Sequence, residues 1–286
     1  MSAFTPDEIA AAFIASCRDE VEAPKPGNVH TFAGGHDMEE RHFLDSARVA
    51  APAIAAPGAR VGARIRKAVE ATFAEVGMNT NLGIILLCAP LARAAESQRD
   101  LCRGLASVLD GLDAQDAADV YAAIARASPG GLGRVARYDV HDAPPSSLPE
   151  AMREAADRDM IARQYVTGFS DIFDAGLSAV TEMQIRGAHH SIALGVCLVF
   201  LSRFPDTHVT RRHGPAVADA LMQEAQSFAA RFRGEAGESA FLADLLAFDA
   251  RLKAQRINPG TSADLTVATL FAARLCGVLP MSPRDG

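Results

Sequence analysis

Three short segments combine a bent backbone with polar side chains in a chain that is otherwise rich in alanine and leucine. They are residues 24–30 (PKPGNVH), 79–83 (NTNLG) and 258–265 (NPGTSADL). Proline fixes φ and cannot donate a backbone hydrogen bond, and glycine lets another group approach the backbone closely. Each segment therefore offers exposed backbone and polar side chains at a helix end, where we expect a phosphate-bearing ligand to bind.

Lys25 and Asp37 are the first charged candidates along the chain. Lys25 stands between two prolines, a pattern that predicts either a phosphate contact or, equally, a solvated lysine in a rigid turn. Asp37 follows two glycines and a histidine. This arrangement suits a metal ligand or a general base, although a helix-capping aspartate beside a surface histidine is the commoner explanation.

Asn79 and Asn81 precede a strongly apolar run in which we expect a buried helix. A short polar side chain at such a position normally caps free helix amides, and these amides also attract anions. Helix capping explains the presence of one asparagine. Two asparagines, followed by Gly83, which leaves room for a ligand to approach the backbone, favour contact with a ligand.

A further charged segment contains Asp206, His208, Arg211 and Arg212. A carboxylate, an imidazole and two guanidinium groups at this spacing predict joint binding of magnesium and a polyphosphate. The alternative is a solvated turn whose ion pair contributes little. We expect Asp264 in the first turn of the last helix, where a carboxylate is favourable even without a ligand.

Apolar residues at helical spacing fill most of the chain and predict an all-α fold. We expect one compact multi-helix domain over residues 1–286, with two nearly all-apolar helices, starting near residues 84 and 191, at the centre of its core. A long loop is predicted at about 128–147. Glycine and proline clusters there flank a short piece that is either a strand or extended chain.

Composition excludes several classes of protein. The net charge of -7 over 286 residues argues against a nucleic-acid partner, because phosphate neutralisation needs clustered Lys and Arg. Five widely spaced cysteines favour neither a disulfide framework nor a zinc site. The apolar runs are shorter than the ~20 residues that cross a bilayer, and the N-terminus has no signal-peptide pattern. We therefore expect a cytoplasmic protein without a membrane partner.

Five short motifs together resemble the triphosphoribosyl-dephospho-CoA synthase family. They are Pro-Lys-Pro-Gly at 24–27, Gly-His-Asp-Met at 35–38, Asn-Thr-x-x-Gly at 79–83, Asp-Thr-His at 206–208 and Pro-Gly-x-Ser-Ala-Asp-Leu at 259–265. The resemblance covers about residues 20–275. It implies an all-α enzyme that joins the triphosphoribosyl unit of ATP to a ribose hydroxyl of 3′-dephospho-CoA and releases adenine. The product is a prosthetic-group precursor for citrate lyase or malonate decarboxylase.

The resemblance, taken together with the chemistry of the side chains, gives expected roles for individual residues. The expected substrate-binding residues are Lys25, Gly27, Asn28, His30, Asn81, Gly83, Arg211 and Arg212. The expected catalytic residues are Asp37, Asp206 and Asn79, and the expected Mg²⁺ ligands are Asp206, His208 and Asp264. Adenine leaves through an oxocarbenium-like state, so the site needs negative charge and a base, for which Asp37 or Asp206 is predicted. Replacing Asp206 by Ala is then expected to abolish turnover and leave thermal unfolding nearly unchanged.

Two motifs depart from the citrate lyase branch of the family, which typically reads Pro-Lys-Pro-Gly-Leu-Val-Asp and Asn-Thr-His-Lys-Gly. Asn28, His30, Asn81 and Leu82 stand here instead. This wording looks more like a sister branch of archaea and methylotrophic bacteria that use methanopterin-type carriers. A different acceptor, water as acceptor, and a non-catalytic nucleotide-binding helical protein are therefore the alternatives, and a homodimer is one expectation for the assembly.

Overall fold

Helix α1 (Pro6–Glu22) shows how the local sequence sets the ends of an element. Its first turn is capped reciprocally, because the hydroxyl of Thr5 accepts from the amide of Glu8 at 3.2 Å and Glu8 Oε2 accepts from the amide of Thr5 at 2.7 Å. The helix ends at Ala23, whose extended backbone leads into Pro24. The segment 24–30 is therefore held at the C-terminal end of a rigid helix.

The structure, a computed structural model, describes residues 4–128, 147–188, 191–232 and 239–282, and its regular elements in these ranges are all helices. After α1 they are α2 (Glu40–Ile54), α3 (Val61–Val76), α4 (Leu82–Ser97), α5 (Leu101–Asp110), α6 (Ala114–Ala127), α7 (Leu148–Ala155), α8 (Met160–Thr167), the π-helix η1 (Asp171–Gly176), α9 (Leu177–Ile185), α10 (Ile192–Arg203), α11 (Thr207–His213), α12 (Pro215–Arg231), α13 (Ser239–Ala254) and α14 (Gly260–Leu275). The all-α prediction is confirmed. The loop predicted at about 128–147 falls almost wholly on residues 129–146, which lie outside the described ranges.

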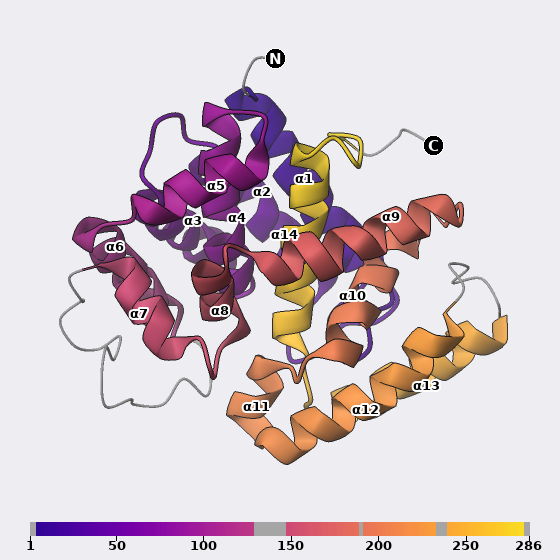
Figure 1. Cartoon of the computed structure of the whole chain (residues 1–286). Coiled ribbons are helices and arrows are strands. Elements are labelled where there is room, and N and C mark those ends of the chain that lie inside the picture. The colour runs from indigo at the N-terminus through magenta and orange to yellow at the C-terminus, as the bar shows by residue number, and fades with distance from the viewer. Residues whose placement is uncertain (1–3, 129–146, 189–190, 233–238, 283–286) are drawn as a thin grey trace.

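Helix α14 crosses the centre of the molecule and packs against α1, α4, α9 and α10 (Figure 1). Of its 16 residues, only Gly260 and Asp264 are not buried. Helices α4 and α10, which the sequence predicts as central, are also buried around most of their circumference, because they are apolar on all sides and not along one stripe. The prediction of two central buried helices is confirmed, and α14 is a third.

Helices α12 and α13 form a hairpin along one edge of the molecule, next to α11 (Figure 1). The rings of Phe228 and Phe248 stack with their centroids 4.9 Å apart and join the two helices. This packing matters for the site, because it brings Asp249 and Lys253 of α13 against the segment 24–30.

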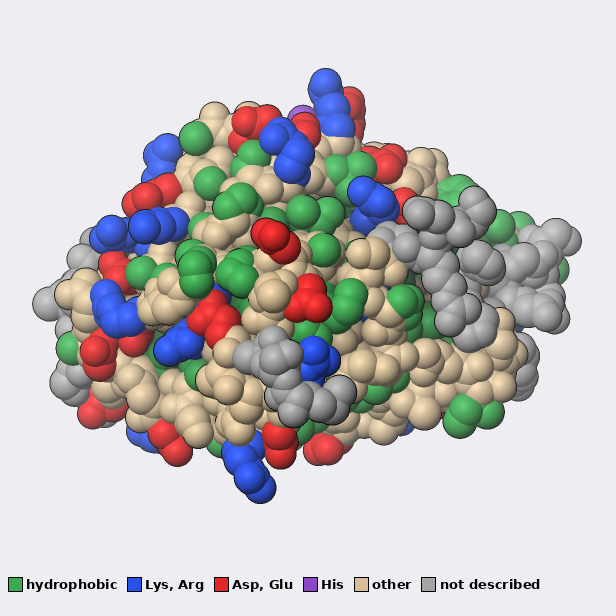
Figure 2. Space-filling model, turned by 90° about the horizontal axis from the view of Figure 1, so that it is seen from above, with side chains coloured by type: hydrophobic (Ala, Val, Ile, Leu, Met, Phe, Trp, Pro, Cys, Tyr) green, Lys and Arg blue, Asp and Glu red, His purple; other side chains and the backbone are tan. Residues whose placement is uncertain are grey.

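The surface carries charges of both signs. On the face shown in Figure 2, lysine, arginine and acidic side chains are scattered among apolar ones and form no continuous basic area. In the part of the chain that the structure describes, no single helix is long and apolar enough to cross a membrane. Helices α10 and α11 reach the required length and apolar composition only when they are counted as one segment, and the chain bends by 53° between them.

Candidate active site

Glycines mark the places where segments distant in sequence touch. A Cβ atom on Gly83 would lie 2.0 Å from Oδ2 of Asp264, and one on Gly260 would lie 2.4 Å from Nδ1 of His208. No larger residue fits either position without displacing its neighbour. The start of α4 and the start of α11 therefore both close onto the start of α14.

The segment 24–30 joins the same cluster. Gly27 has a φ of 76°, and a Cβ on it would lie 2.8 Å from the carbonyl oxygen of Ile257. Asn28 Nδ2 donates to Oδ1 of Asn258 at 2.8 Å, and Nε2 of His36 lies 2.8 Å from the carbonyl oxygen of Gly27. Residues 24–30, 35–38, 79–83, 206–208 and 258–265, called the motif segments below, thus meet in one region.

Asp206 fastens two of these segments together. Its Oδ2 accepts from the amide and the hydroxyl of Ser262 at 2.7 and 2.8 Å, and its Oδ1 accepts from the amide of Val209 at 3.1 Å. Burial raises the pKa of this carboxyl, and the bonds from Ser262 and Val209 oppose the rise. Asp206 is 3% exposed and is not among the residues that line the cavity described next.

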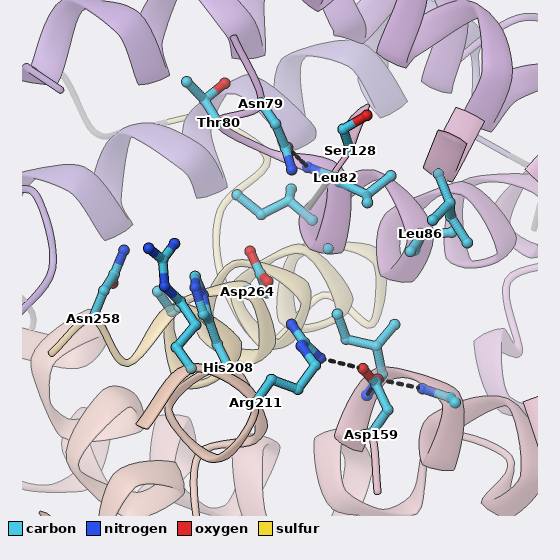
Figure 3. A pocket seen from close by; sticks show the side chains of 18 of the residues that line it. Asn79, Thr80, Leu82, Leu86, Ser128, Asp159, His208, Arg211, Asn258 and Asp264 are labelled. Atoms are coloured by element: carbon cyan, nitrogen blue, oxygen red, sulfur yellow. Dashed lines mark hydrogen bonds and ion pairs between the residues drawn. The ribbon is translucent and has the colours of Figure 1, made fainter. Parts of the chain in front are cut away.

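A cavity of about 650 Å³ opens where the motif segments meet (Figure 3). Of the residues predicted from sequence, those that line it are Asn28, Asp37, Asn79, Gly83, His208, Arg211, Arg212 and Asp264. In Figure 3 Asp264 lies between Asn79 on one wall and His208 and Arg211 on the other. The volume is within the ~300–1,000 Å³ range of small-molecule sites.

Guanidinium groups surround one side of the cavity. Arg211 Nη1 lies 2.5 Å from Oδ2 of Asp159, whose other oxygen caps the first turn of α8. Arg158, Arg212 and Arg256 line the same cavity. Since planar guanidinium groups match phosphate oxygens, this side suits a polyphosphate.

Another part of the cavity lining is apolar and comes from α4, α6, α7 and α8. It includes Leu86, Ile124, Leu148, Met152 and Ile161. The cavity therefore suits a ligand that carries both negative charge and a ring or hydrocarbon surface.

His208 is a neutral imidazole in a basic setting. Burial lowers the pKa of His208 to about 4, and the neighbouring charges of Arg211 and Arg212 contribute to the shift. At neutral pH the ring therefore carries no charge and has one acceptor nitrogen and one donor.

Asp264 is a carboxylate without a compensating partner. Within the described residues it has neither a hydrogen-bond partner nor an ion pair, and it lies in the second turn of α14, one turn later than predicted. Burial raises the pKa of Asp264 well above its usual range, and the charges of Glu20 and Asp206 add to the rise. A carboxylate with a raised pKa binds a proton more readily, which suits a general base.

Lys25 does not line the cavity. Its side chain is fully buried, and Nζ lies 2.7 Å from Oε1 of Glu20, 2.6 Å from the carbonyl oxygen of Glu20 and 3.0 Å from that of Val29. Neither of the two alternatives left by the sequence, a phosphate contact or a solvated lysine, describes this position. Lys25 is an internal partner of a cavity-lining carboxylate.

Gly27 and His30 also face inward, toward α13. The amide of Gly27 donates to Oδ1 of Asp249 at 2.8 Å, and Nε2 of His30 lies 3.2 Å from Oδ2 of the same carboxylate. Lys253 Nζ contacts that oxygen at 2.9 Å. These contacts place Gly27 and His30 behind the cavity wall, where they fix the fold of the segment 24–30.

Asn79 and Asn81 have different positions. Asn79 lines the cavity, and its Oδ1 accepts from the amide of Leu82 at 3.2 Å, which caps α4. Asn81 is 5% exposed, does not line the cavity, and its side-chain nitrogen has no partner within the described residues. Asn79 therefore both caps α4 and contacts the cavity.

The three predicted Mg²⁺ ligands do not form a metal site made by protein atoms alone. Asp206 is used by the amides of α11 and α14, which leaves Asp264 and the neutral ring of His208. In the described ranges, no group of three or more His, Cys, Asp or Glu side chains is placed to hold a metal ion. The donor set fits a cation that arrives with a substrate better than a resident one.

Several residues of the site were not found from the sequence. They are Glu20, Arg158, Asp159, Arg256 and Asn258. Asn258 begins the last motif segment and could have been included for that reason. Glu20 stands within the helical sequence of α1. Arg158 and Asp159 lie in the turn before α8, where the local role of Asp159 is to cap that helix, so nothing marks these residues as parts of a ligand site.

Comparison with known proteins then defines the class and the family. An all-α fold whose cavity combines arginines with an unpaired carboxylate suits an enzyme that acts on a phosphorylated sugar. The family model CitG, ATP:dephospho-CoA triphosphoribosyl transferase, matches residues 6–282, so the chain belongs to this family of transferases. The family resemblance inferred from the motifs is thereby confirmed.

A solved structure supports the fold. A protein of Archaeoglobus fulgidus, provisionally described as a triphosphoribosyl-dephospho-CoA synthase, superposes with a TM-score of 0.61 at 23% sequence identity. The match covers 82% of this chain and 99% of that one. Among curated proteins, none matches the chain.

Proposed function

We propose that this protein transfers the triphosphoribosyl unit of ATP to a ribose hydroxyl of 3′-dephospho-CoA, with release of adenine, and that the transfer takes place in the cavity. Family membership supports the reaction. The observation that supports the place is that the motif segments meet around one hollow with arginines on one side and Asp264 beside them.

The triphosphate is proposed to bind on the arginine side. Arg211 and Arg212 follow directly on the Asp-Thr-His motif, and Arg211 is oriented by Asp159. Their charges neutralise phosphate oxygens that the acidic chain as a whole would repel. Mg²⁺ is proposed to enter as the complex of ATP, and no residue is assigned to hold it.

The sugar chemistry is proposed to centre on Asp264. Asp206 is committed to capping contacts, and Asp37 is 89% exposed at the rim, where it lies 3.8 Å from Arg256. Asp264 is the candidate that is both partly buried and unpaired, so it is the better base for the incoming hydroxyl. Asn79 faces it across the cavity and is placed to hold the ribose or the purine (Figure 3).

The test is an assay for free adenine after incubation with ATP and magnesium, with and without 3′-dephospho-CoA. Adenine that appears only with dephospho-CoA supports the proposal. Adenine without any acceptor indicates a hydrolase, and adenine that appears only with a pterin-type acceptor indicates the other branch of the family. Asp264→Asn is expected to lower kcat by about 100-fold or more, since base catalysis contributes roughly 10²–10⁴.

A further inference from the structure

Glu20 lines the cavity from the last turn of α1 and is only 3% exposed. Its Oε1 faces the ammonium group of Lys25 at 2.7 Å, and the same ammonium reaches two backbone carbonyl oxygens. The contact with Oε1 is an ion pair without hydrogen-bond geometry, and the two carbonyl oxygens are the hydrogen-bond acceptors of the ammonium group. Lys25 does not line the cavity, so it acts on the carboxylate and not on a ligand there.

A buried ion pair of this kind is a poor source of stability. Taking both charges out of water costs roughly as much as their attraction returns, and apolar residues of the same volume are often as stable. The pair is better explained by its effect on Glu20. Burial raises the pKa of Glu20, Lys25 opposes that rise, and the contact fixes the carboxylate at the cavity wall.

A second carboxylate stands in a contrasting environment close by. Asp264 approaches the first turn of α4 through the space left by the missing Cβ of Gly83, and no cation is paired with it within the described residues. Helices α1 and α14, which carry the two carboxylates, pack against each other. Two carboxylates with different partners in one cavity can divide two tasks between them.

We propose that Glu20 is a second catalytic carboxylate of the transfer reaction and that Lys25 is its positioning residue, an inference that rests on the proposed function. The carboxylate of Glu20, held in place by Lys25, stabilises the positive charge that develops on the ribose of ATP. Asp264 accepts the proton of the acceptor hydroxyl.

In this step the bond between C1′ and the adenine nitrogen breaks with its electron pair on adenine, and the bond between C1′ and the acceptor oxygen forms. The hydroxyl gives its proton to Asp264, which later releases it to solvent, and the departing adenine takes a proton from solvent, so the step balances without a further reactant. The two carboxylates supply the negative charge and the base that the transfer requires.

The test compares three variants by the kinetics of adenine release and by thermal unfolding. Glu20→Gln keeps the shape and an oxygen toward Lys25, so we expect kcat to fall about 100-fold or more while KM for ATP changes by less than about threefold. Lys25→Met leaves Glu20 without its cation, so the rise of activity with pH should move to higher pH. The double variant removes both charges and should unfold near the wild-type temperature, yet remain as slow as Glu20→Gln.

The control is Glu22→Gln, which changes the same residue type in the same helical turn at an exposed position outside the cavity, and should leave kcat unchanged. Wild-type kcat in Glu20→Gln would overturn the inference. So would a double variant that recovers activity together with stability, because the pair would then be structural. A wild-type protein that releases no adenine contradicts the proposed function itself, which separates the two failures.

Discussion

At the scale of single residues, His208 shows how the surroundings of a side chain determine its charge. Its pKa falls from 6.5 to about 4 in the folded protein, so below pH 6.5 the unfolded chain binds more protons than the folded one. The contribution of His208 to stability is complete above pH 6.5 and is lost as the pH falls toward 4, by at most about 3 kcal/mol. Carboxyl groups with raised pKa values make the folded protein more stable as the pH falls. The pH dependence of wild-type stability alone therefore does not reveal the contribution of His208.

The expected result concerns the difference between wild type and His208→Gln. Urea unfolding at pH 7 and at pH 4.5 should show that the stability advantage of wild type over the variant shrinks by about 2 kcal/mol at the lower pH. The titration of carboxyl groups common to both proteins cancels in this difference. A gap that stays constant with pH would mean that His208 titrates normally.

The sequence predicted the residue types of the site better than their roles. Asn79, Arg211 and Asp264 were identified because they stand in bent, polar segments, and such segments do line the cavity. Lys25 was expected to bind phosphate because the sequence shows its positive charge but does not show that Glu20 is its partner. Glu20 is separated from it by one helix end, and only the fold shows that the two neutralise each other.

At the scale of elements, the carboxylate of Asp206 joins α11 to α14. Removing it leaves two buried amides and the hydroxyl of Ser262 without their acceptor. We therefore expect Asp206→Ala to lower the free energy of unfolding by about 2–4 kcal/mol. This differs from the expectation drawn from the sequence, which was a loss of turnover at unchanged stability.

Chemical denaturation checks this expectation, with Asp244→Ala as the control. Asp244 also pairs with an arginine, but its side chain is 56% exposed, so its loss should change stability by less than about 1 kcal/mol. If the Asp206→Ala variant is as stable as wild type but inactive, the expectation here is wrong and Asp206 is a catalytic residue.

The contact between α4 and α14 depends on Gly83. Alanine is the better helix former, yet its Cβ would lie 2.0 Å from Oδ2 of Asp264 and 2.8 Å from the side chain of Ile161. Gly83→Ala should therefore displace Asp264 and lower kcat for adenine release by about 10-fold or more, since small misplacements of catalytic groups are costly. In Gly111→Ala the nearest atom would be 3.4 Å away, so that variant should keep wild-type kcat.

Helix type and order could be predicted from periodicity, because α4 and α10 are apolar on every face and α1 is capped by its own residues. The central place of α14 could not. Its sequence holds alanine, threonine and serine, and their burial depends on the neighbouring helices α1, α4, α9 and α10 closing around it. The convergence of the motif segments is likewise a property of helix packing and not of any local pattern.

At the scale of the whole molecule, a chain with a net charge of -7 must bind a highly anionic nucleotide. Long-range attraction does not help, so affinity has to come from the arginines that line the cavity. Arg212 is exposed and belongs to this group, whereas Arg103 is exposed on α5, pairs with Asp100 and lies outside the cavity.

The variants Arg212→Gln and Arg103→Gln change the net charge equally, from -7 to -8 in each case. Calorimetry at low salt should show that Arg212→Gln weakens ATP binding by about fivefold, equivalent to roughly 1 kcal/mol for one charge pair in a solvated setting, while Arg103→Gln leaves it unchanged. At 0.5 M salt the loss should fall below about twofold, because an exposed charge is screened within a few ångströms. Equal losses in both variants would show that ATP responds to the total charge of the protein, and the assignment of the triphosphate to the arginine side of the cavity would then be wrong.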